Sequence, residues 1–167
     1  GMQQFFPIVF VTGYSRSGTT MMARIISRNK PVHAFHEMHF FEELWMPSAE
    51  KKIITHDEGV LLIANMIAIH RDGYLMDRHP EKFLNDAKKM LESYKEEFFP
   101  PMLFKHFLFS ECQLNTKSIP CDQTTRNTLF LTEILEYYPM ARVICMVRDP
   151  RDVLLSQKRK WKRKFLG

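Results

Sequence analysis

The apolar and polar positions at the start of the chain predict a strand, a loop and a helix. Residues 5–12 are a continuous apolar, β-rich run, which is typical of a strand covered on both faces. Residues 13–18 form a loop rich in glycine and serine. Residues 19–28 then place Met and Ile side chains at helical spacing, and Pro31 lies beyond the expected helix end. This order indicates the start of a parallel α/β sheet.

The next part of the chain predicts a short strand and a long helix. We expect the strand and its following loop within residues 31–41. Thr55 and Glu58 have the spacing of a capping box, so an apolar helix should begin there. It should run to about residue 71, with Gly73 as its stop.

Three further segments complete the central part of the pattern. Residues 80–99 have the periodicity of an amphipathic surface helix, which Pro100 and Pro101 should close. Residues 102–109 fit either a strand or a buried turn of helix. A helix is expected over 124–138, because its apolar positions repeat every three or four residues before Pro139.

Composition favours one globular domain over residues 1–167. The chain is 45% hydrophobic and 26% charged, which is ordinary for a folded domain. Its three cysteines form no CxxC pair, so neither a disulfide framework nor a zinc site is indicated. The first apolar run is too short to span a bilayer. We therefore expect a soluble, cytoplasmic protein.

Positive charge is concentrated at the C-terminal end. Residues 148–167 carry eight Lys or Arg against two Asp, so this segment is net +6 and the first 147 residues are net −1. Such a run is most often a solvated helix face, although it could also attract an anionic donor or acceptor. It does not by itself predict a nucleic-acid partner.

A candidate phosphate loop spans residues 13–20. Gly13 and Gly18 are spaced as in a P-loop, where backbone amides and a helix N-terminus surround a phosphate. The position after Gly18 is Thr19, where a nucleoside triphosphatase has its phosphate-binding lysine. The cation in this loop is Arg16. The segment is therefore better suited to a single phosphate, held by amides and by the Thr19 and Thr20 hydroxyls, than to a γ-phosphate with magnesium.

A second candidate anion site begins at Arg148. Residues 141–147 predict a core strand, and Asp149 and Pro150 start a helix after it. Arg148 would lie at the carboxyl end of this strand, where ligands bind in open α/β sheets. Ser156 would lie on the following helix. Two anion sites at two strand ends indicate a nucleotide that carries separate phosphates.

These paired segments resemble the donor-binding motifs of the sulfotransferase family. Residues 16–20 are similar to its 5′-phosphosulfate loop, and residues 148–153 with Ser156 to its 3′-phosphate motif. Residues 122–147 also resemble the family's approach to that motif. The resemblance implies a P-loop-like parallel sheet flanked by helices, with 3′-phosphoadenylyl sulfate as co-substrate and no metal. The implied donor-binding residues are Arg16, Ser17, Gly18, Thr19, Thr20, Arg148 and Ser156.

The chain also departs from the family pattern. Many members have Lys where this chain has Arg16, and a Glu-Lys-Thr-Pro stretch appears here as residues 122–125. The family normally continues further, with a loop that closes over the nucleotide. We therefore expect either an N-terminal portion of such a protein or a member that lacks this lid.

The segment 36–41, His-Glu-Met-His-Phe-Phe, contains the candidate general base. Burial of Glu37 among Phe35, Phe40 and Trp45 would raise its pKa toward neutrality and suit it to accept a proton. The pattern resembles a segment of glycan sulfotransferases whose Glu is the base. Three histidines are alternative bases: His36, His39 and His106. A metal site at His33, His36 and His39 is disfavoured, because the spacing is not that of a known motif.

The sequence thus predicts a sulfotransferase, in which Glu37 activates a hydroxyl or amine and Arg16 stabilises the transferring group. Two rival interpretations are a P-loop nucleotide kinase or triphosphatase and a non-catalytic nucleotide-binding module. The acceptor stays open, since the aromatic residues around Trp45 suit a glycan, a phenol, a peptide or a lipid.

Overall fold

A parallel sheet is the centre of the computed structural model, which describes residues 6–13, 18–48, 50–73 and 77–147. The strands lie in the order β2-β3-β1-β4 and all neighbouring pairs are parallel. Their bounds are β1 Val9–Gly13, β2 Val32–Ala34, β3 Ile119–Asp122 and β4 Arg142–Met146. The predicted α/β class, a parallel sheet flanked by helices, is confirmed.

The two faces of β1 bury different cores, because side chains alternate along a strand. Val11 packs with Ala23 of helix α1 (Gly18–Ser27) on one face. Phe10 belongs to the larger core on the other face, together with Ile134 of helix α5 (Leu131–Tyr137). A strand covered on both faces explains the continuous apolar run in the sequence.

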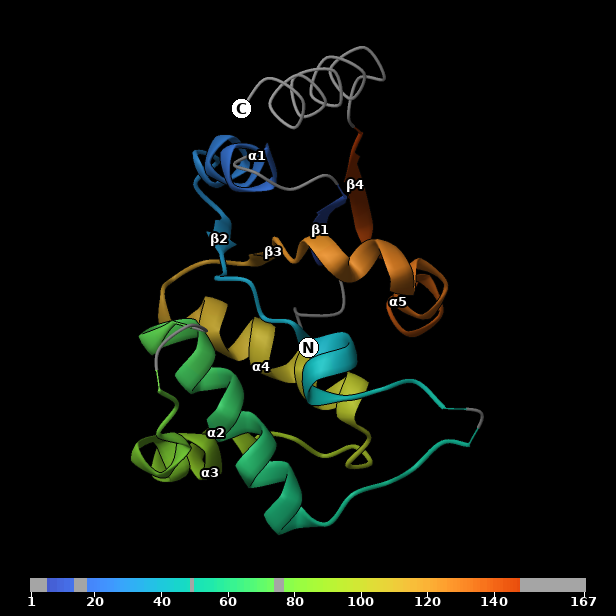
Figure 1. Ribbon diagram of the computed structural model, residues 1–167. Coiled ribbons are helices and arrows are strands. Elements are labelled where there is room, and N and C mark those ends of the chain that lie inside the picture. The colour runs from blue at the N-terminus through green and yellow to red at the C-terminus, as the bar shows by residue number, and fades with distance from the viewer. Residues whose placement is uncertain (1–5, 14–17, 49, 74–76, 148–167) are drawn as a thin grey trace, which may run out of the picture.

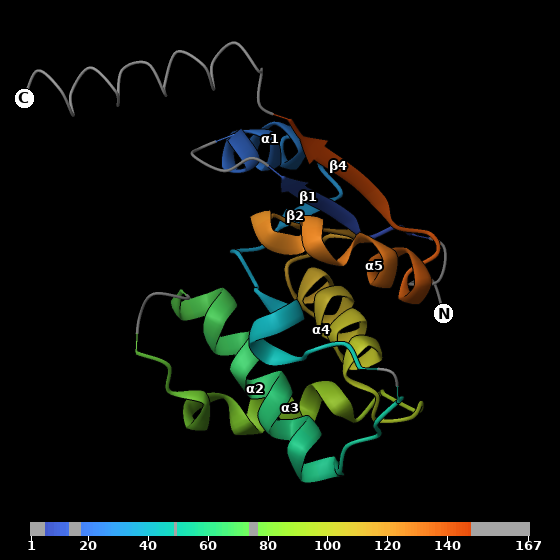
Figure 2. The ribbon, with the colours of Figure 1, turned by 45° about the vertical axis from the view of Figure 1, so that its right-hand side comes forward.

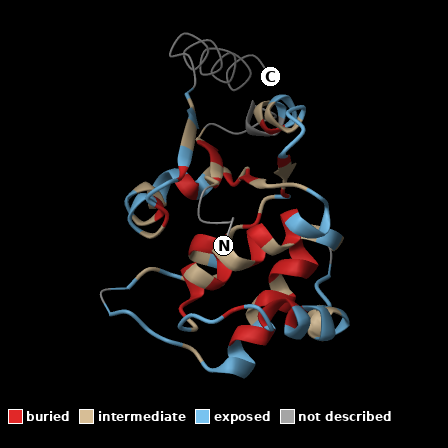
Figure 3. Ribbon diagram, turned by 180° about the vertical axis from the view of Figure 1, so that it is seen from behind, coloured by how far each residue is buried: buried red, intermediate tan, exposed pale blue. Residues whose placement is uncertain are grey.

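A group of helices forms the larger part of that second core. It consists of α2 (His56–Asp72), α3 (Leu84–Leu91) and α4 (Pro100–Leu114). In Figures 1 and 2 the sheet lies between α1 and this group. Figure 3 shows that buried residues concentrate along α2 and α4. We call these three helices the helical layer.

The capping box predicted for α2 is confirmed. The backbone N–H of Glu58 donates to Thr55 Oγ1, and the backbone N–H of Thr55 donates to Glu58 Oε1, both over 3.1 Å. Gly73 ends the helix, with its N–H bonded to the carbonyl of Ile69 and a φ of 96°. Glycine adopts such a positive φ without a side-chain clash, so it suits this position.

The helix predicted over 80–99 is confirmed only over part of that range. The segment forms a short 3₁₀ turn, Pro80–Phe83, followed by α3, which ends at Leu91. Pro100 and Pro101 begin α4 instead of closing a helix. Proline is tolerated in a first helical turn, because the N–H that it lacks would have no partner there.

Two other segments refine the predicted pattern. Residues 102–109 belong to α4, so of the two alternatives the helix is confirmed. The helix expected over 124–138 begins instead as a 3₁₀ turn, η4 (Thr125–Phe130), before α5. The strand expected over 141–147 is β4, although among the described strands it lies at an edge of the sheet and is only partly covered.

Candidate active site

The two candidate phosphate segments leave the sheet from paired residues. Gly13 is the last residue of β1 and pairs in register with Met146, the last residue of β4. Carboxyl ends of parallel strands lie at the same edge of a sheet, where open α/β sheets bind ligands. The loop after Gly13 and the segment that begins at Arg148 therefore start from neighbouring points.

Gly13 allows this close approach of the two strand ends. Its φ is 102°, and a Cβ atom at this position would collide with the backbone of Met146. A larger residue would need both a different backbone conformation and a wider gap between the strands. A glycine at the end of β1 thus has a direct structural reason.

Most of the predicted donor-binding side chains lie outside the described residues. This holds for Arg16, Ser17, Arg148 and Ser156. Residues 18–20 form the first turn of α1, directly after the loop. A helix N-terminus in this place offers free amides and partial positive charge to an anion.

Glu37 lies in the segment 35–39, between β2 and the next helical turn. Its carboxylate pairs with His39, with 3.0 Å between Oε2 and Nε2. The side chain of Glu37 is 43% exposed, whereas Phe35 and Phe40 are buried in the core. The enclosure of Glu37 predicted from the sequence is therefore wrong, because these rings pack on the helical layer, as in the stack of Phe40 on Phe104.

An unusual backbone follows Glu37. His39 has a φ of 49° and Glu42 has a φ of 81°, both in the left-handed region that few residues other than glycine adopt. Such conformations persist where surrounding contacts hold them, and they occur often at functional sites. One of those contacts is a two-pronged ion pair from Arg126 to Glu42, with both bonds at 2.9 Å.

A buried polar cluster at the end of β3 contacts the same segment. Thr124 Oγ1 accepts the backbone N–H groups of Met38 and His39, over 3.1 and 3.3 Å, and donates to Asp122 Oδ1 over 2.9 Å. The other oxygen of Asp122 accepts from Asn127 over 2.7 Å. Burial raises the pKa of Asp122 to about 6, although these hydrogen bonds act to lower it.

The same region ties the strand ends to η4. Thr12 is fully buried next to Gly13, and its hydroxyl donates to the carbonyl of Thr125 over 2.8 Å. Gln123 donates to the carbonyl of Phe35 over 2.8 Å. The end of β1, the end of β3 and the segment that carries Glu37 are therefore joined by direct hydrogen bonds.

The alternative histidines lie in three different environments. His39 contacts Glu37, as described above. The backbone N–H of His36 lies 3.4 Å from Nδ1 of His70 on α2. His106 lies on α4, with Nε2 2.8 Å from the carbonyl oxygen of Met90, in the helical layer. The structure therefore brings His39, but not His106, into contact with Glu37.

Two residues of this site, Thr124 and His70, carried no predicted role. Thr124 belongs to the stretch that resembles the family, so a hydroxyl just after a strand end was an available signal. His70 had a weaker signal, a histidine near the end of an otherwise apolar helix. Among the described residues no group of three or more His, Cys, Asp or Glu could hold a metal ion.

A cavity of about 530 Å³ lies elsewhere on the molecule. Its walls include the rings of Trp45, Phe99 and Tyr137 and the carboxylates of Glu133 and Glu136. Tyr137 is the last residue of α5 and precedes the amino end of β4. That strand end is opposite to the edge at which Gly13 and Met146 meet, so this cavity is separate from the candidate donor site.

The sequence matches the model described as "Sulfotransferase family" over residues 7–166. The chain belongs to the sulfotransferase family, and it is an enzyme of that class. Its family implies a nucleotide donor and an acceptor for the sulfuryl group. Searches of curated proteins and of solved structures gave no match. Within the described part of the chain, no helix has the length and apolar character needed to cross a membrane.

Proposed function

We propose that this sulfotransferase binds 3′-phosphoadenylyl sulfate across the ends of β1 and β4. The observation that carries the proposal is the register of Gly13 with Met146. Because these two strand ends are neighbours, the proposed 5′-phosphosulfate loop and the proposed 3′-phosphate motif would follow from adjacent points, which suits one nucleotide with two separate phosphate groups. The donor contacts proposed here are Arg16, Ser17, Gly18, Thr19 and Thr20 at one end and Arg148 and Ser156 at the other.

The reaction is an in-line transfer of the sulfuryl group. An acceptor hydroxyl or amine attacks sulfur while its proton passes to the Glu37 carboxylate. The bond between sulfur and the bridging oxygen breaks, and its electron pair stays on the 5′-phosphate of adenosine 3′,5′-bisphosphate. Arg16 stabilises the negative charge that develops on the bridging oxygen. The atoms and charges of this step balance without a metal ion.

The partly exposed carboxylate of Glu37 supports its assignment as the base. A group that takes a proton from an acceptor has to be reachable by that acceptor. His39, 3.0 Å from this carboxylate, is placed to share or receive the proton. The pair Glu37–His39 thus offers a short route for the proton away from the acceptor.

Calorimetric titration with adenosine 3′,5′-bisphosphate tests the donor site. Arg148→Ala should weaken binding roughly thirtyfold, about 2 kcal/mol, because a phosphate loses a charge-assisted partner. An exposed lysine changed in the same way, Lys88→Ala, is the control. Equal affinities for Arg148→Ala and the parent would remove Arg148 from the site, and tighter binding of ATP with magnesium would favour a kinase or triphosphatase.

A transfer assay with ³⁵S-labelled donor tests the reaction. Glycans, tyrosine-containing peptides and small phenols serve as acceptors. We expect Glu37→Gln to bind adenosine 3′,5′-bisphosphate as the parent does but to lose turnover at least a hundredfold. Normal turnover by this variant would assign the base role to a histidine. Donor binding without transfer to any acceptor would indicate a non-catalytic module.

A further inference from the structure

Residues on both sides of Glu37 are held by hydrogen bonds to their backbone rather than to their side chains. Thr124 accepts the N–H groups of Met38 and His39, and His70 accepts the N–H group of His36. Both partners come from distant parts of the chain, one after β3 and one near the end of α2. Glu37 lies between these held positions, with its side chain partly exposed.

We propose that Thr124 is a positioning residue for sulfuryl transfer, which fixes the backbone after Glu37, and that His70 supports the backbone before it. This inference rests on the proposed role of Glu37 as the base. Thr124 and His70 need not touch either substrate. They act on where the Glu37 carboxylate points.

The geometry of Thr124 suits this role because its hydroxyl is fully used. The single hydroxyl proton is given to Asp122, so the oxygen lone pairs remain free to accept from the two backbone amides. Asn127 holds the other oxygen of Asp122. All three side chains of this cluster are buried, so water cannot easily take their place.

The backbone of His39 explains why such a hold is needed. Its φ of 49° is unfavourable for a residue with a Cβ atom, so the segment would relax if its contacts were lost. His39 also provides the ring that pairs with Glu37. Relaxation at His39 would therefore move both members of the proposed proton pathway at once.

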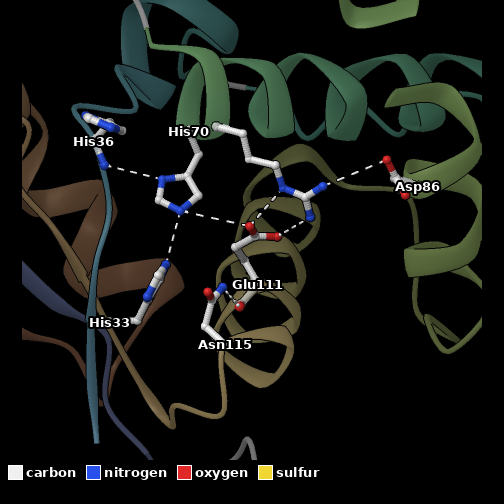
Figure 4. Close-up of polar contacts among 7 residues, drawn as sticks. His33, His36, His70, Asp86, Glu111 and Asn115 are labelled. Carbon is white, nitrogen blue, oxygen red and sulfur yellow. Dashed lines mark hydrogen bonds and ion pairs between the residues drawn. The ribbon is translucent and has the colours of Figure 1, made fainter. Parts of the chain in front are cut away.

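His70 provides the opposing support, as Figure 4 shows. Its Nδ1 faces the N–H of His36 at 3.4 Å, so the proton of the neutral ring lies on Nε2, which is 3.1 Å from Nε2 of His33. Burial lowers the pKa of His70 to about 3, so the ring stays a neutral acceptor near neutral pH. Its bond is longer than those of Thr124, and we assign it the smaller effect.

Hydroxyl removal at Thr124 is the main test. Thr124→Val keeps the shape of the side chain but removes the acceptor, whereas Thr124→Ser keeps the hydroxyl. We expect Thr124→Val to lower kcat in the ³⁵S-transfer assay by ten- to a hundredfold, since small displacements of a catalytic group have effects of this size. Its affinity for adenosine 3′,5′-bisphosphate should stay within twofold. Thr124→Ser should keep kcat within threefold, and so should the control Thr132→Val at an exposed position of α5.

Amide hydrogen exchange gives a second readout that needs no acceptor. The amides of Met38 and His39 should exchange at least tenfold faster in Thr124→Val than in the parent or in Thr124→Ser. His70→Leu should affect the amide of His36 in the same way, with a smaller loss of kcat. If Thr124→Val does not fold, Thr124→Cys, with its weak acceptor, takes its place and should show the same changes.

The outcomes separate this inference from the proposed function. A parent enzyme that neither binds the bisphosphate nor transfers sulfate would refute the proposed function, while amide exchange still tests the hold on the backbone. An active parent with a normal Glu37→Gln variant would remove the base and, with it, the positioning role. If Glu37→Gln is inactive but Thr124→Val has parental kcat, the positioning inference alone is wrong.

Discussion

Two buried carboxylates lie behind the residues that hold the Glu37 segment, and they are stabilised in opposite ways. Asp122 accepts from Thr124, and Glu111 lies 4.0 Å from Nε2 of His70. Asp122, at the end of β3, has the uncharged partners Thr124 and Asn127 among its hydrogen bonds. Glu111, on α4, has a cation: Arg71 donates to both of its oxygens over 3.0 and 2.9 Å. A buried acid with neutral partners keeps much of its desolvation penalty, whereas a paired acid offsets it. Of the two carboxylates, Asp122 should therefore make stability depend on pH, whereas Glu111 should be sensitive to the loss of its cation.

The largest effect is expected from breaking the pair in the helical layer. Arg71→Met leaves the Glu111 carboxylate, with a side chain only 4% exposed, without its cation. We expect the free energy of unfolding at pH 7 to fall by about 3 kcal/mol. Urea denaturation measures this. A loss below about 1 kcal/mol would mean that neutral partners alone can support a carboxylate here, as they do for Asp122.

The next effect concerns His70, which lies beside this pair. Its pKa is about 3 in the folded protein and near 6.5 when unfolded, because burial disfavours the charged ring. Stability from this neutral ring is present above pH 6.5 and is lost as pH falls toward 3. Between pH 7 and pH 4 the parent should lose about 3 kcal/mol more than His70→Gln.

Urea denaturation at both pH values measures that difference, and His56→Gln at an exposed position is the control. Equal losses for the parent and His70→Gln would show that the ring is already protonated in the folded state at pH 4.

Asp122 should show a pH dependence of the opposite sign. Its pKa is raised by burial to about 6 in the folded protein, from an ordinary value of 3.8. The stability contributed by its protonated form is present below pH 3.8 and is lost as pH rises through 6. From pH 4 to pH 7 the parent should lose about 2 kcal/mol relative to Asp122→Asn. The same slope for both proteins would contradict the contrast between the two carboxylates.

The smallest effect is expected from an exposed pair with similar geometry. Arg126 binds Glu42 with two bonds, as Arg71 binds Glu111, but it lies at the surface. Arg126→Met should therefore change the free energy of unfolding by less than about 1 kcal/mol. A loss as large as that of Arg71→Met would show that bond geometry, rather than burial, determines the difference.

The elements with local signals could be predicted from the sequence. The capping box at Thr55 and the stop at Gly73 mark the ends of α2, and the apolar run of β1 follows from its two covered faces. In contrast, β3 has only four residues and includes Pro120, a residue type that is rare inside a sheet. It pairs with strands on both sides, so long-range packing overrides its local preference.

The site divides in the same way. The sequence predicts phosphate contacts after Gly13 and at Arg148 and a base at Glu37, and these roles stay predictions. The contacts of Thr124 could not be predicted, because it meets Met38 and His39 across more than eighty residues. The exposure of Glu37 was also hidden, since its aromatic neighbours in sequence turn into the core and leave its carboxylate at the surface.

Gly13 has one more consequence for the proposed reaction. In the proposed complex, the pairing of β1 with β4 brings the starting points of the two donor-binding segments next to each other, because Gly13 lacks the Cβ atom that would collide with Met146. The hydrogen bonds between the two strands then fix the distance between these starting points. We expect an adenosine donor without the 3′-phosphate to lose the contacts proposed after β4. This loss gives a physical basis for selecting the doubly phosphorylated compound over ordinary adenine nucleotides.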